Sequence, residues 1–439
     1  MSLTDTRFQG VLKGWASVRH WAFAPVKSGG ERLAYILFFA LQVAGRMPRI
    51  LGEGRFWAEE GQTFFVNAWN LPWSEALIVS YGGYLNFCAN LAGVLARHFA
   101  PLSTAPYVST AFALLIQCIP AVVIVTSRAP WLRSRIVCIA ALLIIATPPC
   151  SAEVWLTSIH SQSHLALAAG LILSLPTRGG VVGAMYCLTL STAALTGPAS
   201  WALAPLFAIR AAIDRSPARA TQALFISAAV LFQLVFFFRP MPGREIGIAP
   251  SLFGAIVLVK HIVLPFVSLH WIGDGNPFAS FSESLPLWPL LAVVLIFAVA
   301  IYAALLHFRE APIFLLLSGA AIAASGYIGA IGPKAELLQA VNGGRYAFVP
   351  QVLLGLALLS WGIIHQRPTR LLAQIAVVWL IVVGLSDYVP PRKWMIQTGP
   401  QWAVEVQKWH LDANYRLQIW PAGWSMTLTP PNPDIKSVR

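Results

Sequence analysis

The chain has 439 residues, of which 57% are hydrophobic and only 11% are charged, and its formal net charge is +13 at pH 7. Continuous apolar runs recur from Leu33 to Leu385, which is more apolar sequence than the core of one soluble domain would use, so a soluble globular protein is excluded. The runs also lack the alternation of apolar and polar residues found in membrane β-barrels, so that class is excluded too. Lys and Arg in a membrane protein are first a topology signal, so the positive charge does not indicate nucleic-acid binding. The composition predicts an all-α polytopic membrane protein.

A basic tail precedes the first apolar run. It carries Lys13, Arg19, Lys27 and Arg32, and the run after it has no small-residue cleavage pattern. We therefore expect a cytoplasmic N-terminal tail over residues 1–32 and a first span over residues 33–47, rather than a removed signal peptide.

Two later apolar stretches are not expected to cross the membrane. Residues 77–99 and 251–270 contain polar and charged side chains that are costly at a bilayer centre. We expect both to form helices that lie at the external interface or re-enter from it; the alternative is an ordinary span with a satisfied buried charge. About 11 transmembrane helices then remain. Their expected ranges are 33–47, 105–126, 136–149, 164–176, 180–196, 200–212, 220–238, 286–307, 311–331, 347–365 and 368–386.

This arrangement places the basic loops inside and two long loops outside. The transmembrane domain covers residues 33–386, with external loops over 48–104 and 239–285, and a short external tail covers 387–439. The cytoplasmic loops are those at residues 128–135, 178, 210–219, 309 and 367–370. Because these are too short for a cytoplasmic domain, we expect any chemistry to occur outside or within the membrane.

The stretch "RFWAEEGQ" places two acids, Glu59 and Glu60, at the start of the first external loop. They could belong to a solvated loop with an aromatic interface belt, or one could be a general base or metal ligand in a cavity. Neighbouring residues on a helix point about 100° apart, so the two acids should not share one role. Because a helix is expected to begin at Gly61, Glu60 suits a cap and we favour Glu59 as the base.

A second polar cluster lies in "CSAEVWLTSIHSQSHLAL", after the third expected span. Polar side chains between two apolar runs are expensive unless they line a hydrated cavity. His160 and His164 have a spacing that can bind metal, but no HExxH pattern accompanies them, so we expect hydrogen-bonded structural histidines and no metal. The candidates for cavity or acceptor contacts are Arg46, Glu153, His160, Gln162, His164 and Tyr346.

Cations gather on the same expected face of the membrane. The segment "RPMPGRE" holds Arg244, "VLVKHIVLP" holds Lys260 and His261, and "GGRYAFVP" holds Arg345. Such a row suits the phosphate of a lipid headgroup. The alternatives are ordinary contacts with anionic lipids and, for Arg345, an interfacial anchor.

The external tail contains "YRLQIWPAGWSMTL", whose alternation predicts a small strand pair or hairpin. One of its Trp residues could stack on a sugar, but packing against the interface is the favoured interpretation.

This layout resembles the membrane glycosyltransferases of the GT-C superfamily. "GRMPRILGEGRFWAEEGQ" resembles their acidic first-loop motif, and "GGRYAFVP" is similar to an Arg-Tyr followed by Pro in several bacterial members. "EVWLTSIHSQSHLAL" partly resembles an E…N-x-Q-like segment of bacterial relatives, with Ser161 beside Gln162. The family often has Asp in the first-loop pair, where this chain has Glu.

The resemblance implies an inverting sugar transfer from a polyprenyl-phosphate donor to a lipid or glycan acceptor, at the periplasmic face of a bacterial inner membrane. It implies Glu59 or Glu60 as general base, and Arg244, Lys260, His261 or Arg345 as the group that stabilises the departing phosphate. The two acids could share a divalent cation such as Mg²⁺ or Mn²⁺, although the sequence shows no complete ligand set.

Other functions compete with this interpretation. A transporter or flippase of lipid-linked glycans would place ionisable residues near the bilayer midplane on broken, repeated helices, whereas here the charges gather at one face and no repeat is evident. An O-antigen-type polymerase or ligase would use the same class of donor and external arginines. A purely structural membrane subunit is a further alternative.

Overall fold

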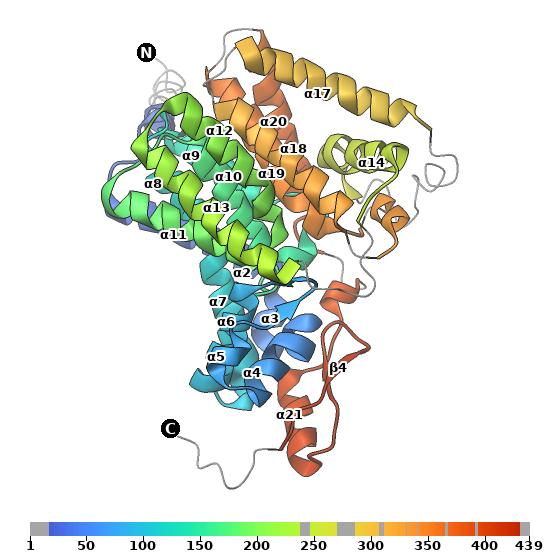
Figure 1. Ribbon diagram of the computed structural model, residues 1–439. Helices are drawn as coiled ribbons and strands as arrows, with labels where there is room; N and C mark the ends of the chain where they lie inside the picture. Colours follow the sequence, from blue (N-terminus) through green and yellow to red (C-terminus); the bar gives the residue numbers. More distant parts are fainter. Residues whose placement is uncertain are drawn as a thin grey trace, which may run out of the picture.

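The computed structural model describes residues 17–237, 246–269, 286–306, 311–330, 332–339, 341–364, 368–390 and 394–430. Most of these residues are helical, and two short β-hairpins accompany the helices. Figure 1 shows a large helical body and, at the end of the molecule away from the N-terminus, a smaller group of elements that contains α3, α4, α5, α6 and α21.

Helices occur at every range in which the sequence predicts a span. They are α2 (Gly29–Arg46), α7 (Ala105–Gln117) with α8 (Ile119–Thr126), α9 (Arg135–Ala146), α10 (Ser161–Ser174), α11 (Gly180–Thr196), η5 (Pro198–Leu203) with α12 (Ala204–Asp214), α13 (Pro217–Phe237), α17 (Trp288–Leu306), α18 (Ala311–Ile328), α19 (Gly344–Ile364) and α20 (Thr369–Ser386). The shorter elements of the chain are α3 (Pro48–Glu53), η1 (Glu60–Phe65), α4 (Val66–Asn70), α5 (Trp73–Ala76), η2 (Leu102–Thr104), η3 (Pro130–Leu132), η4 (Ala152–Val154), η8 (Lys334–Leu338) and η9 (Met395–Gln397).

Five helical segments are long and apolar enough to cross a bilayer. They are Leu102–Thr126, Pro217–Phe237, Ala311–Ile328, Gly344–Ile364 and Thr369–Ser386. Other segments are short: α9 has 12 residues and α12 has 11. At 1.5 Å per residue each covers less than about 20 Å of a hydrocarbon core that is about 30 Å thick. The protein is therefore a helical membrane protein, and the full set of about 11 crossings stays a prediction.

The expectation of a helix over the whole of residues 77–99 is wrong at its start. A β-hairpin occupies this region, with β1 (Ser80–Tyr81) paired antiparallel to β2 (Tyr84–Leu85), and α6 (Phe87–Phe99) begins only after it. The cause is the Tyr-Gly-Gly-Tyr turn, because Gly82 and Gly83 have φ angles of 69° and 76°, which a tight hairpin turn requires. Asn86 then caps α6 by accepting a hydrogen bond from the backbone N–H of Ala89.

The second of these stretches is helical over Pro250–Phe266. It consists of α14 (Pro250–Val257), a π-helical turn η6 (Leu258–Val263) and a 3₁₀ turn η7 (Leu264–Phe266). Lys260 and His261 lie in the π-helical turn, and both are buried.

The connection between α9 and α10, residues 147–160, is the most unusual part of the core because it is not an α-helix and every residue except Glu153 is buried. Backbone polar groups that are buried away from water need hydrogen-bond partners. We call this segment the buried connection. Side chains from distant parts of the chain supply these partners. Asn86 donates to the carbonyl of Ile159, Arg46 to the hydroxyl of Ser151, and Arg55 to the carbonyls of Trp155 and Leu156. Gln117 donates to the carbonyl of Val154 and accepts from the N–H of Leu156, and Glu60 accepts from the N–H of Ser158.

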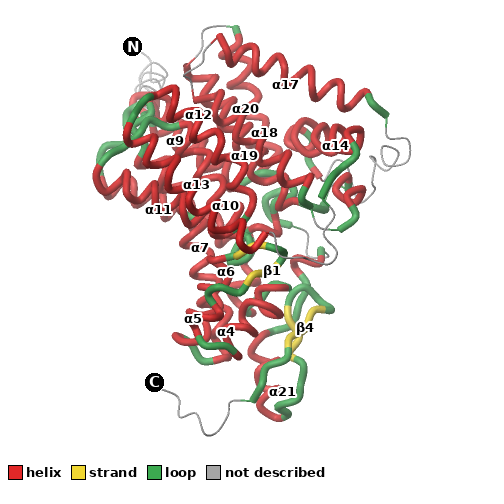
Figure 2. The backbone as a smooth tube through the Cα atoms, in the orientation of Figure 1, coloured by secondary structure: helices red, strands yellow, loops and turns green. Residues whose placement is uncertain are grey.

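The C-terminal tail folds into α21 (Trp402–Leu411) and an antiparallel hairpin of β3 (Leu417–Ile419) and β4 (Trp424–Met426), which confirms the predicted strand pair. Its hairpin meets residues 56–58, where the backbone N–H of Trp420 donates to the carbonyl of Phe56 and the N–H of Ala58 donates to the carbonyl of Trp420. Figures 1 and 2 show these C-terminal elements beside the N-terminal α3 and α4. The segment next to Glu59 therefore depends on the C-terminal hairpin for its conformation.

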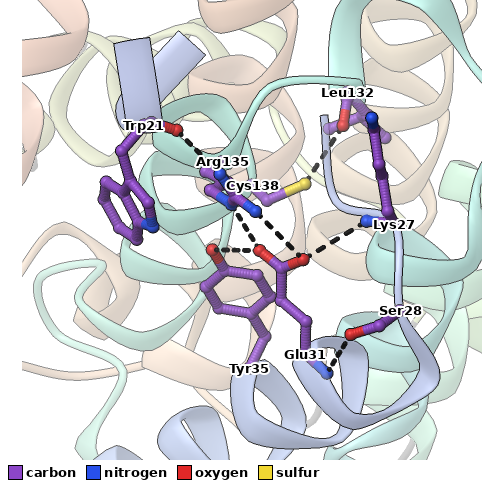
Figure 3. A network of polar contacts seen from close by, with 8 residues as sticks. All are labelled: Trp21, Lys27, Ser28, Glu31, Tyr35, Leu132, Arg135 and Cys138. Carbon is purple, nitrogen blue, oxygen red and sulfur yellow. Dashed lines mark hydrogen bonds and ion pairs between the residues drawn. The ribbon is translucent and has the colours of Figure 1, made fainter. Parts of the chain in front are cut away.

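A polar network joins the N-terminal segment to the α8–α9 loop and the start of α9 (Figure 3). The guanidinium of Arg135 pairs with the carboxylate of Glu31 at 2.5 Å and lies over the ring of Trp21. The N-terminal segment thus lies at the same end as the basic loop 128–135, which the positive-inside assignment requires.

Gly344, the first residue of α19, lies in close contact with the buried connection. A Cβ on Gly344 would collide with the carbonyl oxygen of Cys150, whereas a Cβ on Gly179 would meet open space. We expect Gly344→Ala to lower the free energy of unfolding by about 2 kcal/mol through overpacking, and Gly179→Ala to leave it nearly unchanged. Thermal unfolding of the purified protein in nanodiscs measures the difference, and equal melting temperatures for the two variants would contradict the close packing.

Candidate functional site

A cavity of about 390 Å³ lies where the helical body meets the smaller group of elements. Its walls come from residues 57–64, the β1–β2 hairpin, the starts of α10 and α19, the η5 turn, and the ends of α13 and α18. Five of the residues that the sequence predicts for a site line this cavity. They are Glu59, His160, Gln162, Arg345 and Tyr346.

Glu59 is half-buried in the cavity wall and follows a strained residue. The φ angle of Ala58 is 39°, a left-handed conformation that costs a residue with a Cβ about 1–3 kcal/mol and persists only where its surroundings fix it. Here the backbone N–H of Ala58 donates to the carbonyl of Trp420 at 2.5 Å. Burial, and then the nearby carboxylate of Glu59, raise the pKa of Tyr81, another residue of the cavity wall.

Glu60 points away from the cavity into the protein core and is 3% exposed. Its Oε1 accepts hydrogen bonds from the hydroxyl of Ser109 at 2.7 Å and from the backbone N–H of Ser158 at 2.8 Å. Its Oε2 accepts from the backbone N–H of Trp57 at 3.1 Å. The two neighbouring acids therefore have different surroundings, and Glu60 anchors the loop to the buried connection.

Arg345 is the cation of the cavity. Its backbone N–H donates to Oε1 of Glu153 at 2.5 Å, and its guanidinium lies 3.4 Å from Oε2 of the same carboxylate. Burial is the largest single effect and would raise the pKa of Glu153, but the charge of Arg345, its backbone N–H and other nearby cationic groups together outweigh burial and hold this pKa below its usual value. Glu153 thus stays ionised and orients Arg345 at the start of α19, where Arg345 interacts electrostatically with Glu59.

His160 and Gln162 complete the polar part of the wall. His160 is 4% exposed, and burial lowers its pKa to about 4, so its ring is neutral at neutral pH. The side-chain amide of Gln162 donates to the hydroxyl of Tyr84 at 3.3 Å. This contact requires Gly197, because a Cβ there would collide with the amide oxygen of Gln162.

The other predicted site residues lie outside the lining of this cavity. Arg46 supports the buried connection, and His164 contacts the carbonyl of Val154 and the rings of Trp155 and Phe348. Lys260 donates to the carbonyls of Gln339 and Asn342, and His261 bonds the hydroxyl of Tyr327. Arg244 lies outside the described residues.

Sequence reasoning missed much of the aromatic part of the wall, which includes Trp57, Tyr81, Tyr84 and Trp201. The Tyr-Gly-Gly-Tyr turn signal could have revealed two of them, since paired glycines between aromatic residues are typical of a hairpin. The apolar remainder of the wall includes Leu234, Phe237 and Ile246.

Neither a metal cluster nor a known relative identifies the site. Among the described residues, no group of three His, Cys, Asp or Glu side chains could hold a metal ion. Comparison of the chain with protein-family models, with curated proteins and with solved structures gives no match. The residues of the cavity are therefore the guide to its function.

Because Glu59 and Glu60 have different surroundings, their substitution should change the free energy of unfolding by different amounts. We expect Glu60→Gln to lower the free energy of unfolding by about 3 kcal/mol, because buried N–H and O–H donors lose a charged acceptor. Glu59→Gln replaces a half-buried cavity side chain and should change stability by no more than about 0.5 kcal/mol. Equilibrium denaturation in micelles compares the variants, and a loss in Glu59→Gln as large as that in Glu60→Gln would contradict the assignment.

Proposed function

We propose that the protein is a GT-C-type glycosyltransferase that moves a sugar from a polyprenyl-phosphate donor to a lipid or glycan acceptor at the external face of a bacterial inner membrane. The observation that carries the proposal is that one cavity contains a carboxylate, Glu59, and a cation, Arg345, within an apolar and aromatic wall. An acidic group can accept the acceptor's proton, a cation can bind phosphate, and apolar side chains can contact the lipid.

The proposed reaction is an inverting displacement. The Glu59 carboxylate takes the proton of the acceptor hydroxyl, and the acceptor oxygen forms a bond with the anomeric carbon of the donor sugar. The bond between that carbon and the phosphate oxygen breaks, and the phosphate leaves with the electron pair. Arg345, oriented by Glu153, stabilises the negative charge that develops on the phosphate.

Glu60, Lys260 and His261 are left out of this mechanism because each already has hydrogen-bond partners away from the cavity. Trp201, Leu234 and Phe237 offer the donor's lipid an apolar surface in the same cavity as the charged groups. This combination supports an amphipathic substrate rather than a water-soluble sugar nucleotide.

The transfer is tested with radiolabelled polyprenyl-phosphate sugars added to the purified protein in nanodiscs, together with lipid and glycan acceptors. We expect Glu59→Gln to reduce turnover by about 10²-fold or more, because general-base catalysis contributes that much. Arg345→Gln should cost about 10²-fold through loss of charge stabilisation. Glu75→Gln, which alters an exposed acid in α5, is the matched control and should keep the wild-type rate.

The same assay separates the rival functions. A transporter or flippase would move the donor across a vesicle membrane without consuming it, and that result would overturn the proposal. A polymerase or ligase would also consume the donor, but its acceptor would be a preformed glycan chain. Full turnover in Glu59→Gln would eliminate this residue as the base.

A further inference from the structure

The segment before α2 is fixed against the loop that joins α8 to α9. Residues 17–23 are helical, and the following residues pair antiparallel with residues 133–135 through a bridge between Pro25 and Ser134. The guanidinium of Arg135 donates to the carbonyl of Trp21 and lies over its ring (Figure 3). We call residues 17–27 the N-terminal strap. Backbone and side-chain contacts together hold the strap in one orientation on the protein.

The strap lies at the level where membrane helices end. The long apolar segment Leu102–Thr126 ends just before the α8–α9 loop, α9 begins at Arg135, and α2 begins at Gly29, directly after the strap. An apolar helix that crosses a bilayer ends near the boundary between hydrocarbon and headgroups. The positions of these three ends therefore put the strap at headgroup depth.

Large apolar side chains of the strap point away from the protein. Val18, Trp21 and Phe23 are 58%, 50% and 65% exposed, and Ala22 is the one buried residue of the strap. Exposed Trp and Phe side chains next to cations are typical of a helix that lies in the plane of the membrane interface, where its apolar side chains leave water.

The charge of this surface has one sign. Arg19 and Lys27 of the strap and Arg128 and Arg133 of the loop are exposed, and neither the strap nor residues 127–134 contains an acid. Glu31, the nearest acid in sequence, is paired with Arg135 at 2.5 Å and so does not neutralise the exposed cations. Four exposed cations beside apolar side chains are complementary to a bilayer whose headgroups carry negative phosphates.

We propose that the N-terminal strap and the α8–α9 loop form a docking surface for anionic phospholipids of the bilayer around the protein. Trp21 and Phe23 enter the interface, and the exposed cations contact the headgroup phosphates. A lipid surface fits better than a soluble protein partner, because the ends of the neighbouring spans keep the strap in contact with the bilayer. The inference uses no residue of the cavity and is independent of the proposed transfer reaction.

The experiment measures which lipids contact the strap. The full chain with Phe23→Cys is labelled with bimane and placed in nanodiscs of phosphatidylcholine. A rising fraction of lipid with a doxyl quencher near the headgroup end of its acyl chain is included, either as phosphatidylglycerol or as phosphatidylcholine. Four of the five native cysteines are buried, and the unsubstituted chain gives the background. Leu411→Cys is the matched control, because Leu411 is a 90% exposed apolar residue in the distant α21 (Figure 1).

We expect both quenchers to act on the label at position 23 and neither to act on the label at position 411. Half-maximal quenching should need about fivefold less phosphatidylglycerol than phosphatidylcholine, the effect of about one cation close to an anionic surface. High salt should reduce this preference, because the charges are exposed and therefore screened. The preference should also disappear in the combined Arg19→Gln, Lys27→Gln and Arg133→Gln variant and persist in Arg416→Gln, which removes an exposed cation of the C-terminal tail.

Three results would overturn the proposal. They are a label at position 23 that is quenched no more than the label at position 411, equal quenching by the two lipids, and a preference that survives in the combined variant or is lost equally in Arg416→Gln. The lipid comparison and its salt dependence use the Phe23→Cys chain alone, so they decide the matter even if the combined variant does not fold.

Discussion

The buried connection between α9 and α10 is the constraint on which the rest of the structure depends. Its backbone lies in the core, is not an α-helix and must pair its N–H and C=O groups without water. Side chains from α2, from the segment after α3, from the N-cap of α6 and from α7 supply the partners. Several polar groups of this apolar chain, Arg46, Arg55 and Glu60 among them, are therefore parts of the scaffold.

The same hydrogen bonds give the cavity its chemistry. Because Glu60 is fixed to Ser109 and Ser158 on the inner side, its neighbour Glu59 is free to lie in the cavity wall. The connection also presents Glu153, which holds Arg345 at the start of α19, while His160 closes its end. A carboxylate, a cation and an imidazole ring line one cavity because a single irregular segment determines the position of all three.

The sequence predicted much of this architecture but only part of the site. Apolar runs located the helices, and alternation located the C-terminal hairpin, because both signals depend on neighbours in the chain. The neighbouring sequence does not distinguish the role of Glu59 from that of Glu60, because the difference arises from hydrogen bonds of Glu60 with the distant residues Ser109 and Ser158. Lys260 likewise looked like a phosphate ligand, but its ammonium group bonds backbone carbonyls of residues 339 and 342. The β1–β2 hairpin escaped notice because an apolar run surrounds its turn.

The bridge between Trp57 and Trp420 has a consequence for biosynthesis. Residues 56–58 leave the ribosome long before Trp420 does, so the turn that carries Glu59 can acquire its strained form only after Trp420 has been synthesised. All the predicted membrane segments are synthesised before that moment. Insertion into the bilayer and maturation of the cavity are thus separate events, and a partly made chain in the membrane cannot yet hold Glu59 in place.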